Sequence, residues 1–505
     1  MNILLQHPAF RWLLASLFAG LSALLLAGCA ALPPYRTEIG PNKAPCTLEE
    51  PTQDTEGRVI WESDRSACAH AWAVRSPSHG VNYIEIDEQG MLASRQAMED
   101  ALAYAGEPSP SGKPAYVLVF VHGWHHNGSA DDGNVQAFHS ALAALRAWHD
   151  DADVRGIYIS WRGESISAPG LRYLTFWDRK NTSDEVGRGG LLEFLLRLER
   201  AVKRSPSLPA GAPSQADVVA GANAVLPPSP NKLVLIGHSF GASVTFNALA
   251  HVYLERFLDG VYSTSTKPEP RFRGYGDLVM LINPAIEAMR YAPFQNAIND
   301  YTTRSTPPQA DFSNDPLPKL VILSSLGDWA TRKTFRVARF FSTVLEKHER
   351  IDDAIQPDDK QLTSEWVLDQ VTVGNYGGFH THWPLHIVSG PAQTSNQVAA
   401  PGDSKIKTLA AQGPGQCTAL SKTDIKRRLD VVAETDPALA GPGATFEEFP
   451  DSNIRIVRKP TPVKGSPYVL ADVGTELIAD HSQINNLNLI CWADQLVSGF
   501  DAPKR

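Results

Sequence analysis

Five short apolar runs in the middle of the chain constrain its fold more than any other feature. Each run is followed by a loop and then by apolar residues at helical spacing. This pattern is typical of parallel strands that are covered on both faces, and it predicts an α/β fold with a doubly wound, mostly parallel sheet. The runs are AYVLVFVHG (115–123), VRGIYISW (154–161), KLVLIGHS (232–239), LVMLINPA (278–285) and KLVILSSLGD (319–328).

Length and charge narrow the class of protein further. The chain has 505 residues, of which 43% are hydrophobic and 20% are charged, so it can bury a sizeable core. Its formal net charge of -9 argues against a nucleic-acid partner, because phosphate backbones are bound by positive surfaces. In a doubly wound sheet, the binding crevice is expected at the carboxyl ends of the strands.

The third apolar run leads into Gly237-His238-Ser239-Phe240-Gly241. A GxSxG pattern occurs by chance in about one chain in six of this length, so the flanking residues must show whether it is functional. Here a strand precedes the pattern directly, and a run with helical periodicity follows it. A strand that turns at once into a helix strains the residue between them, and small neighbours such as Gly237 and Gly241 allow the close packing. We therefore expect Ser239 to be a nucleophile; the alternative is a serine in a tight turn.

This strand, turn and helix resemble the nucleophile elbow of the α/β-hydrolase superfamily, which includes serine esterases and lipases. The resemblance covers about residues 114–500 and implies an α/β-hydrolase fold with cap and insertion segments. It also implies catalytic residues in the order serine, acid, histidine. Asp328, at the end of the fifth run, fits the acid, although it could instead cap the following helix. His481, in ELIADHSQ, fits the histidine; the rivals are His380 and His382.

The turn after the first run is similar to the HG turn of many α/β-hydrolases. The resemblance implies that the backbone N–H groups of Trp124 and Phe240 form an oxyanion hole, and that Gly123 lets the loop approach the substrate. The same turn carries three histidines that could indicate a metal site, but no carboxylate or cysteine stands beside them at ligand spacing. We expect neither a metal nor a cofactor. The histidines are His122, His125 and His126.

The N-terminal apolar stretch ends in Leu26-Ala27-Gly28-Cys29, which resembles the bacterial lipobox. The resemblance implies that residues 1–28 are a signal peptide and that Cys29 is lipidated and anchors the protein to a membrane of the cell envelope. Ala30, rather than an aspartate, follows the cysteine and favours the outer membrane. The alternative is an uncleaved transmembrane helix, since the stretch approaches about 20 residues.

The other four cysteines fit an oxidising compartment, because their number is even. They permit three pairings, of which we expect Cys46 with Cys68 and Cys417 with Cys491. The alternative for Cys491 is a buried free thiol in an apolar stretch.

The composition also suggests boundaries along the chain. We expect residues 29–55 to be a flexible tether, 56–113 an N-terminal extension, and 114–500 the α/β domain. A segment at about 390–450 is rich in Pro, Gly and Ala and is expected to be an insertion. After it, the sheet is expected to resume at SNIRIVRKP (452–460) and PYVLADVGTELIADH (467–481).

Together these features predict a membrane-anchored serine hydrolase that cleaves carboxylic esters through an acyl-enzyme on Ser239. Its substrate would be a small-molecule or lipid ester. Two alternatives stay open. An acyltransferase would use the same three residues with an alcohol acceptor, and a non-catalytic surface lipoprotein would keep the fold without the activity.

Overall fold

A computed structural model describes the greater part of the chain. The described residues are 33–38, 44–49, 51–53, 59–63, 65–163, 176–203, 229–262, 273–304, 317–348, 350–351, 363–388, 414–437, 446–460 and 467–499. The predicted signal peptide and the lipidation site at Cys29 lie outside them.

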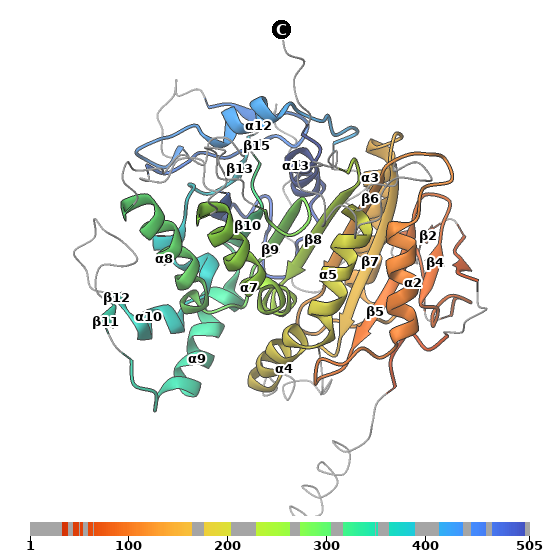
Figure 1. Cartoon of the computed structure of the whole chain (residues 1–505), viewed down its shortest axis with the longest axis horizontal. Coiled ribbons are helices and arrows are strands. Elements are labelled where there is room, and N and C mark those ends of the chain that lie inside the picture. Colours follow the sequence, from red (N-terminus) through yellow and green to blue (C-terminus); the bar gives the residue numbers. More distant parts are fainter. Residues whose placement is uncertain are drawn as a thin grey trace, which may run out of the picture.

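A nine-stranded, mostly parallel sheet forms the centre of the molecule, as the apolar runs predict (Figure 1). The five runs are strands in which nearly every residue is buried, because helices cover both faces. Only the pair β4 and β5 is antiparallel in this sheet. In spatial order the strands are β1 (Cys46–Thr47), β4 (Ala73–Arg75), β5 (Gly80–Ile86), β7 (Asp153–Trp161), β6 (Ala115–Val121), β8 (Lys232–His238), β9 (Leu278–Ile282), β10 (Leu320–Ser325) and β16 (Tyr468–Val473).

The order of the strands contains a switch point. From β6 the chain moves to β7 on one side, whereas β8, β9, β10 and β16 follow one another on the other side. The strands β6 and β8 are direct neighbours, with Val119 opposite Leu235. Loops that leave neighbouring parallel strands in opposite directions open a crevice at their carboxyl ends, which is where α/β proteins bind ligands.

Helices cover the two faces of the sheet and form two apolar cores. One core contains Val117 and Val119 of β6, with helices α2, α5, α7 and α8. The other contains Leu118 and Phe120, with α3 and α13. The helices are α2 (Arg95–Gly106), α3 (Gly133–Trp148), α4 (Phe176–Arg188), α5 (Gly190–Lys203), α7 (Phe240–Tyr262), α8 (Ala288–Arg304), α9 (Phe335–Thr343), α10 (Glu365–Gln370), α12 (Lys422–Leu429) and α13 (Leu487–Val497).

Shorter elements complete the fold. A π-helical turn, η3 (Ala330–Thr334), precedes α9, and the 3-10 turns η4 (Val373–Asn375) and η5 (Gly377–Phe379) follow α10. The pair β2 (Thr52–Gln53) and β3 (Val59–Ile60) is antiparallel, as is the pair β11 (Arg350–Ile351) and β12 (Thr363–Ser364). A three-stranded sheet contains β13 (His386–Ile387), β15 (Ile454–Arg455) and β14 (Glu448–Phe449).

The strand pairing differs from the expected organisation at two points. The N-terminal extension and part of the tether belong to the central sheet, because β1, β4 and β5 extend it beyond β7. Residues 452–460 do not return to that sheet; Ile454 and Arg455 pair with β13 and β14 instead. The central sheet resumes at β16, beside β10, which confirms the second of the two expected segments. Strands from both sides of residue 114 therefore belong to one sheet.

Disulfide bonds attach the predicted tether and the predicted insertion to the rest of the fold. Cys46 of β1 is bonded to Cys68, and Cys417 is bonded to Cys491 of α13. These are the two expected pairings, and Cys491 is not a free thiol. The second bond fastens the described part of the predicted insertion to the helix that follows the last strand.

Candidate active site

Ser239 lies at the sharp turn between β8 and α7. Its φ of 56° is in the left-handed region, which is strained for a serine. The flanking glycines allow this turn, because a Cβ on Gly237 would lie 2.9 Å from the Ala242 Cα, and one on Gly241 would lie 2.2 Å from the Val121 carbonyl oxygen. The amide of Ser239 donates to the carbonyl of Ile282 at the end of β9. Its hydroxyl is thereby fixed at the N-terminus of α7.

Three residues from distant parts of the chain meet at this turn. The Ser239 hydroxyl and Nε2 of His481 are 2.7 Å apart, and Nδ1 of His481 lies 2.9 Å from a carboxylate oxygen of Asp328. Ser239 follows β8, Asp328 follows β10 and His481 follows β16, so each comes from the carboxyl end of its strand. Ser239 and Asp328 are buried, whereas the His481 side chain is 23% exposed. The three residues expected from the sequence are thus brought together.

Asp328 is held as an anion. Burial alone would raise the pKa of its carboxyl, but the hydrogen bond and the charge of His481, together with two hydrogen bonds from Thr331, outweigh burial and lower it. The backbone N–H of Thr331 donates to Oδ1, and its hydroxyl donates to Oδ2. Asp328 therefore also accepts hydrogen bonds from the turn that leads into α9, as the capping alternative predicts, besides its contact with His481.

Two side chains that the sequence did not single out fix the backbone of His481. Nε2 of His238 lies 2.8 Å from the His481 carbonyl oxygen, and the amide of Asn283 donates to the same oxygen over 3.0 Å. Burial, followed by the nearby charge of His481, lowers the pKa of His238 to about 3, so its ring is neutral and donates through Nε2. Asn283 also accepts the Ser325 amide at the end of β10. These bonds join the loops that carry the three candidate residues.

The loop after β6 lies directly against the turn. A Cβ on Gly123 would lie 2.7 Å from the Ser239 Cβ and 3.0 Å from the His238 carbonyl oxygen. The next residue, Trp124, packs against Phe240, with ring centroids 5.9 Å apart. Phe240 is the first residue of α7, where backbone N–H groups have no partner within the helix. The two expected oxyanion donors thus lie on segments that meet beside Ser239.

The histidines after β6 have structural partners. His122 is fully buried and stacks on Trp161, whose backbone N–H it accepts through Nε2. Burial lowers the pKa of His122 to about 4, which keeps it neutral. His126 lies 3.1 Å from the carboxylate of Asp132, the N-cap of α3. His125 adopts a φ of 66° in the turn between them.

The rival histidines lie in other hydrogen bonds. Nε2 of His380 contacts the carbonyl of Gly374, and Nε2 of His382 contacts the carbonyl of Leu429. Both side chains are buried, and burial lowers the pKa of His380 and lowers that of His382 to about 3. Of the three histidines considered from the sequence, His481 is the one bonded to Ser239.

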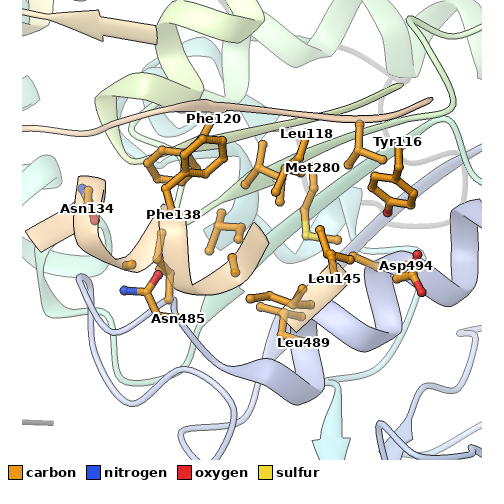
Figure 2. Close-up of a pocket in the computed structure, with 18 residues that line it drawn as sticks. Tyr116, Leu118, Phe120, Asn134, Phe138, Leu145, Met280, Asn485, Leu489 and Asp494 are labelled. Carbon is orange, nitrogen blue, oxygen red and sulfur yellow. The ribbon is translucent and has the colours of Figure 1, made fainter. Parts of the chain in front are cut away.

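An apolar cavity of about 50 Å³ lies between α3 and α13 (Figure 2). Its walls include Leu118, Phe138, Met280 and Leu489, and neither Ser239, Asp328 nor His481 lines it. A cavity of this size holds only a few water molecules. We interpret it as a gap in the packing of two helices rather than as a pocket for a substrate.

Comparisons with known proteins add no relative. No protein-family model matches the chain, and no curated protein or solved structure is significantly similar to it. Within the described residues, every helix is too short or too polar to cross a membrane. Among the described residues, one cluster has side chains close enough together to bind a metal ion. It contains Glu346, His348 and Asp369.

Proposed function

We propose that this protein is a serine hydrolase that cleaves carboxylic esters through an acyl-enzyme on Ser239. One observation carries the proposal: a continuous chain of hydrogen bonds runs from the Ser239 hydroxyl through His481 to Asp328, with lengths of 2.7 and 2.9 Å. A nucleophile, a base and a group that orients the base are the minimum that acyl transfer needs.

Each residue has a distinct step in the proposed reaction. Ser239 Oγ bonds to the acyl carbon while Nε2 of His481 takes its proton. Asp328 accepts the hydrogen bond from Nδ1–H and stabilises the positive imidazolium. The imidazolium then gives the proton to the departing alcohol. His481 then takes a proton from water, which attacks the acyl carbon. The bond between that carbon and Ser239 Oγ breaks, the imidazolium returns the proton to Oγ, and the carboxylic acid leaves.

The tetrahedral intermediates carry a negative oxygen that needs donors. We assign this role to the backbone N–H groups of Trp124 and Phe240, with the N-terminus of α7 adding a favourable field. These residues complete the chemistry, so the proposal requires no cofactor. The order of the three residues along the chain, and their positions after β8, β10 and β16, support an α/β-hydrolase fold.

The N-terminal sequence supports a location in the cell envelope. We infer that residues 1–28 are removed and that Cys29 carries acyl chains that anchor the protein, as the lipobox-like Leu26-Ala27-Gly28-Cys29 suggests. Mass spectrometry of the N-terminal peptide from bacterial membranes tests this inference. An unmodified peptide that begins at Met1 would contradict it.

A fluorophosphonate probe tests the proposed nucleophile, because it phosphonylates activated serines. The wild type is expected to be labelled and to hydrolyse chromogenic esters, whereas Ser239→Ala is expected to lose both properties. Ser243→Ala is the matched control, since Ser243 lies one helical turn further along α7 and contacts Asp184 instead of His481. Equal labelling of the wild type and Ser239→Ala would sink the proposal. Added alcohols that accelerate acyl transfer over hydrolysis would indicate an acyltransferase.

A further inference from the structure

The segment that carries Asp328 continues into a helix with an apolar outer surface. After Asp328 the chain passes through η3 into α9. Large apolar side chains are exposed along this segment, whereas such residues usually lie in the interior. They are Trp329 (63% exposed), Val337 (60%), Phe340 (44%), Val344 (57%) and Leu345 (94%), which we call the α9 surface. Large exposed apolar side chains gathered within one short segment are a feature of binding surfaces.

Three of the exposed residues lie on one side of α9 and its C-terminal end. Val337, Phe340 and Val344 are spaced by three and four residues, so they share a face. The opposite face holds α9 to the body: Phe335 and Ala338 are buried. Arg339 lies between the two faces and forms an ion pair with Asp369 of α10. One face of α9 is thus used by the fold, and the other is turned outward.

Positive charges surround the α9 surface. Lys333, Arg336 and Lys347 are exposed, and none of them takes part in an ion pair with another described residue. The carboxylate of Glu346 is exposed beside them, so cations exceed anions along the segment. Apolar side chains flanked by lysine and arginine are typical of surfaces that lie on anionic lipid, with the apolar groups among the acyl chains and the cations among the headgroups.

The α9 surface also lies at the appropriate edge of the molecule. It follows the carboxyl end of β10, and Figure 1 shows α9 and α4 at the same edge. Arg162, which follows the carboxyl end of β7, donates a hydrogen bond to the carbonyl of Pro33 over 3.5 Å. Pro33 is the first described residue. An anchor at Cys29 would therefore leave the body at the edge that carries both α9 and Ser239.

We propose that the α9 surface docks onto an anionic phospholipid bilayer and holds the Ser239 site against the lipid. An aromatic contact links the surface to the site: the Phe335 ring, on the inner face of α9, lies 6.2 Å from that of Phe176, which lies 5.4 Å from that of Phe240. An ester within the bilayer would reach Ser239 without crossing bulk water. The docking itself does not depend on the proposed hydrolysis.

Hydrogen exchange on the full chain, reconstituted into vesicles, tests the docking. We expect amides in residues 329–347 to exchange at least about fivefold more slowly on vesicles of phosphatidylcholine with phosphatidylglycerol than on phosphatidylcholine alone. Peptides from α12 are expected to exchange equally on both. Trp329→Ser/Val344→Ser/Leu345→Ser should abolish the difference, as should Lys333→Gln/Arg336→Gln, which keeps the apolar side chains. The control Val432→Ser removes a side chain that is 54% exposed beyond α12 and should not change it.

Two results would overturn the docking proposal. One is equal exchange in residues 329–347 on the two kinds of vesicle. The other is protection that rises with protein concentration in detergent without lipid, because the α9 surface would then join two copies of the chain.

Ester hydrolysis separates this proposal from the proposed function. The apolar triple variant should keep its rate on a water-soluble ester and lose most of its rate on an ester carried in anionic vesicles. Absence of hydrolysis in every variant would remove the proposed function, while exchange would still decide the docking.

Discussion

Asn283 has no place in the proposed chemistry, yet it contacts the segments of two candidate residues. It adopts a φ of 47° at the end of β9 and is completely buried. Its amide nitrogen donates to the carbonyl oxygen of His481, and its amide oxygen accepts the N–H of Ser325, three residues before Asp328. We regard Asn283 as a positioning residue that sets the distance between the base and the acid.

Asn283→Asp is expected to lower kcat by about 10- to 100-fold with little change in KM, because small displacements of reacting groups cost this much. The carboxylate keeps the shape and can accept from Ser325, but it cannot donate to His481. Asn453→Asp is the control, since Asn453 has a similar φ of 53° and is exposed. Steady-state kinetics on a soluble ester check the result. A rise in KM at constant kcat would show that Asn283 serves binding rather than positioning.

Gly123→Ala is expected to reduce kcat by about 100-fold or more, the cost of losing one oxyanion donor. Its new Cβ would lie 2.7 Å from the Ser239 Cβ, so the loop after β6 must move away. Gly133→Ala adds the same methyl group where no other atom lies within 4 Å and should retain full activity. Comparable kcat values for the two variants would contradict the assignment of this loop.

At the residue scale, the sequence predicted the candidate site unevenly. Ser239, Asp328 and His481 could be predicted from the sequence, because each directly follows an apolar strand or lies in the last loop before a helix. His238 and Asn283 could not be predicted, because both act through hydrogen bonds to the His481 carbonyl group, which is distant in the sequence. The Asn-Pro pair that ends LVMLINPA is a turn signal. It indicates the bend but not the partner.

The elements nearest the N-terminus contain a buried ionic cluster. Arg36 is fully buried, forms a 2.6 Å ion pair with Glu62, and lies over the Tyr83 ring of β5. Its Nε donates to the carbonyl of Gly128, in the loop that follows β6. Burial would lower the pKa of the Arg36 guanidinium, but the neighbouring Tyr83 and Glu62 outweigh burial and raise it. The cluster fastens residues that the composition assigned to a tether to the edge of the sheet.

Arg36→Ala is expected to cost about 3–5 kcal/mol of unfolding free energy, because it leaves the Glu62 carboxylate buried without its partner. Urea unfolding at pH 7 measures the change. Arg95→Ala removes an exposed ion pair with Glu193 and should have little effect. A loss no larger than that of the control would mean that the N-terminal segment adds little to the fold.

These elements were hidden in the sequence for a physical reason. The strands β1 and β4 are only two and three residues long, which is too short for a periodic pattern. The strand β5 alternates polar and apolar residues and suggests a half-exposed strand, yet every residue in it is buried. Asn82 and Glu85 are accommodated there by hydrogen bonds, from Arg75 and from the amides of Tyr35 and Arg36.

For the whole molecule, Glu85 gives a pH dependence of stability. Burial raises its pKa from 4.5 to about 7, although hydrogen bonds and the charge of Arg36 oppose this. The folded chain therefore holds a proton that the unfolded chain releases. The contribution of this proton to the free energy of unfolding is fully present below pH 4.5 and is lost as the pH rises to about 7.

Glu85→Gln, which stays neutral, should therefore gain stability over the wild type as the pH rises. The gain should approach roughly 3 kcal/mol at pH 8 compared with pH 4.5, because a tenfold change in proton affinity between the folded and unfolded chain is worth about 1.4 kcal/mol. Glu99→Gln, at an exposed position, should follow the wild type. Denaturant midpoints across this pH range check the prediction, and a gap that stays constant or narrows as the pH rises would contradict it.

The base of the proposed reaction comes from the far end of the chain. His481 follows β16, which is both the edge of the sheet and its last strand in chain order. During synthesis, Ser239 is added to the chain more than two hundred residues before His481. Until β16 lies beside β10, the imidazole of His481 has no fixed place beside the Ser239 hydroxyl. On the proposed mechanism, Ser239 therefore lacks its base for as long as the chain is being synthesised. In the proposed mechanism, ester cleavage therefore begins only after the chain has folded to its last strand, and no separate inhibitor is needed before then.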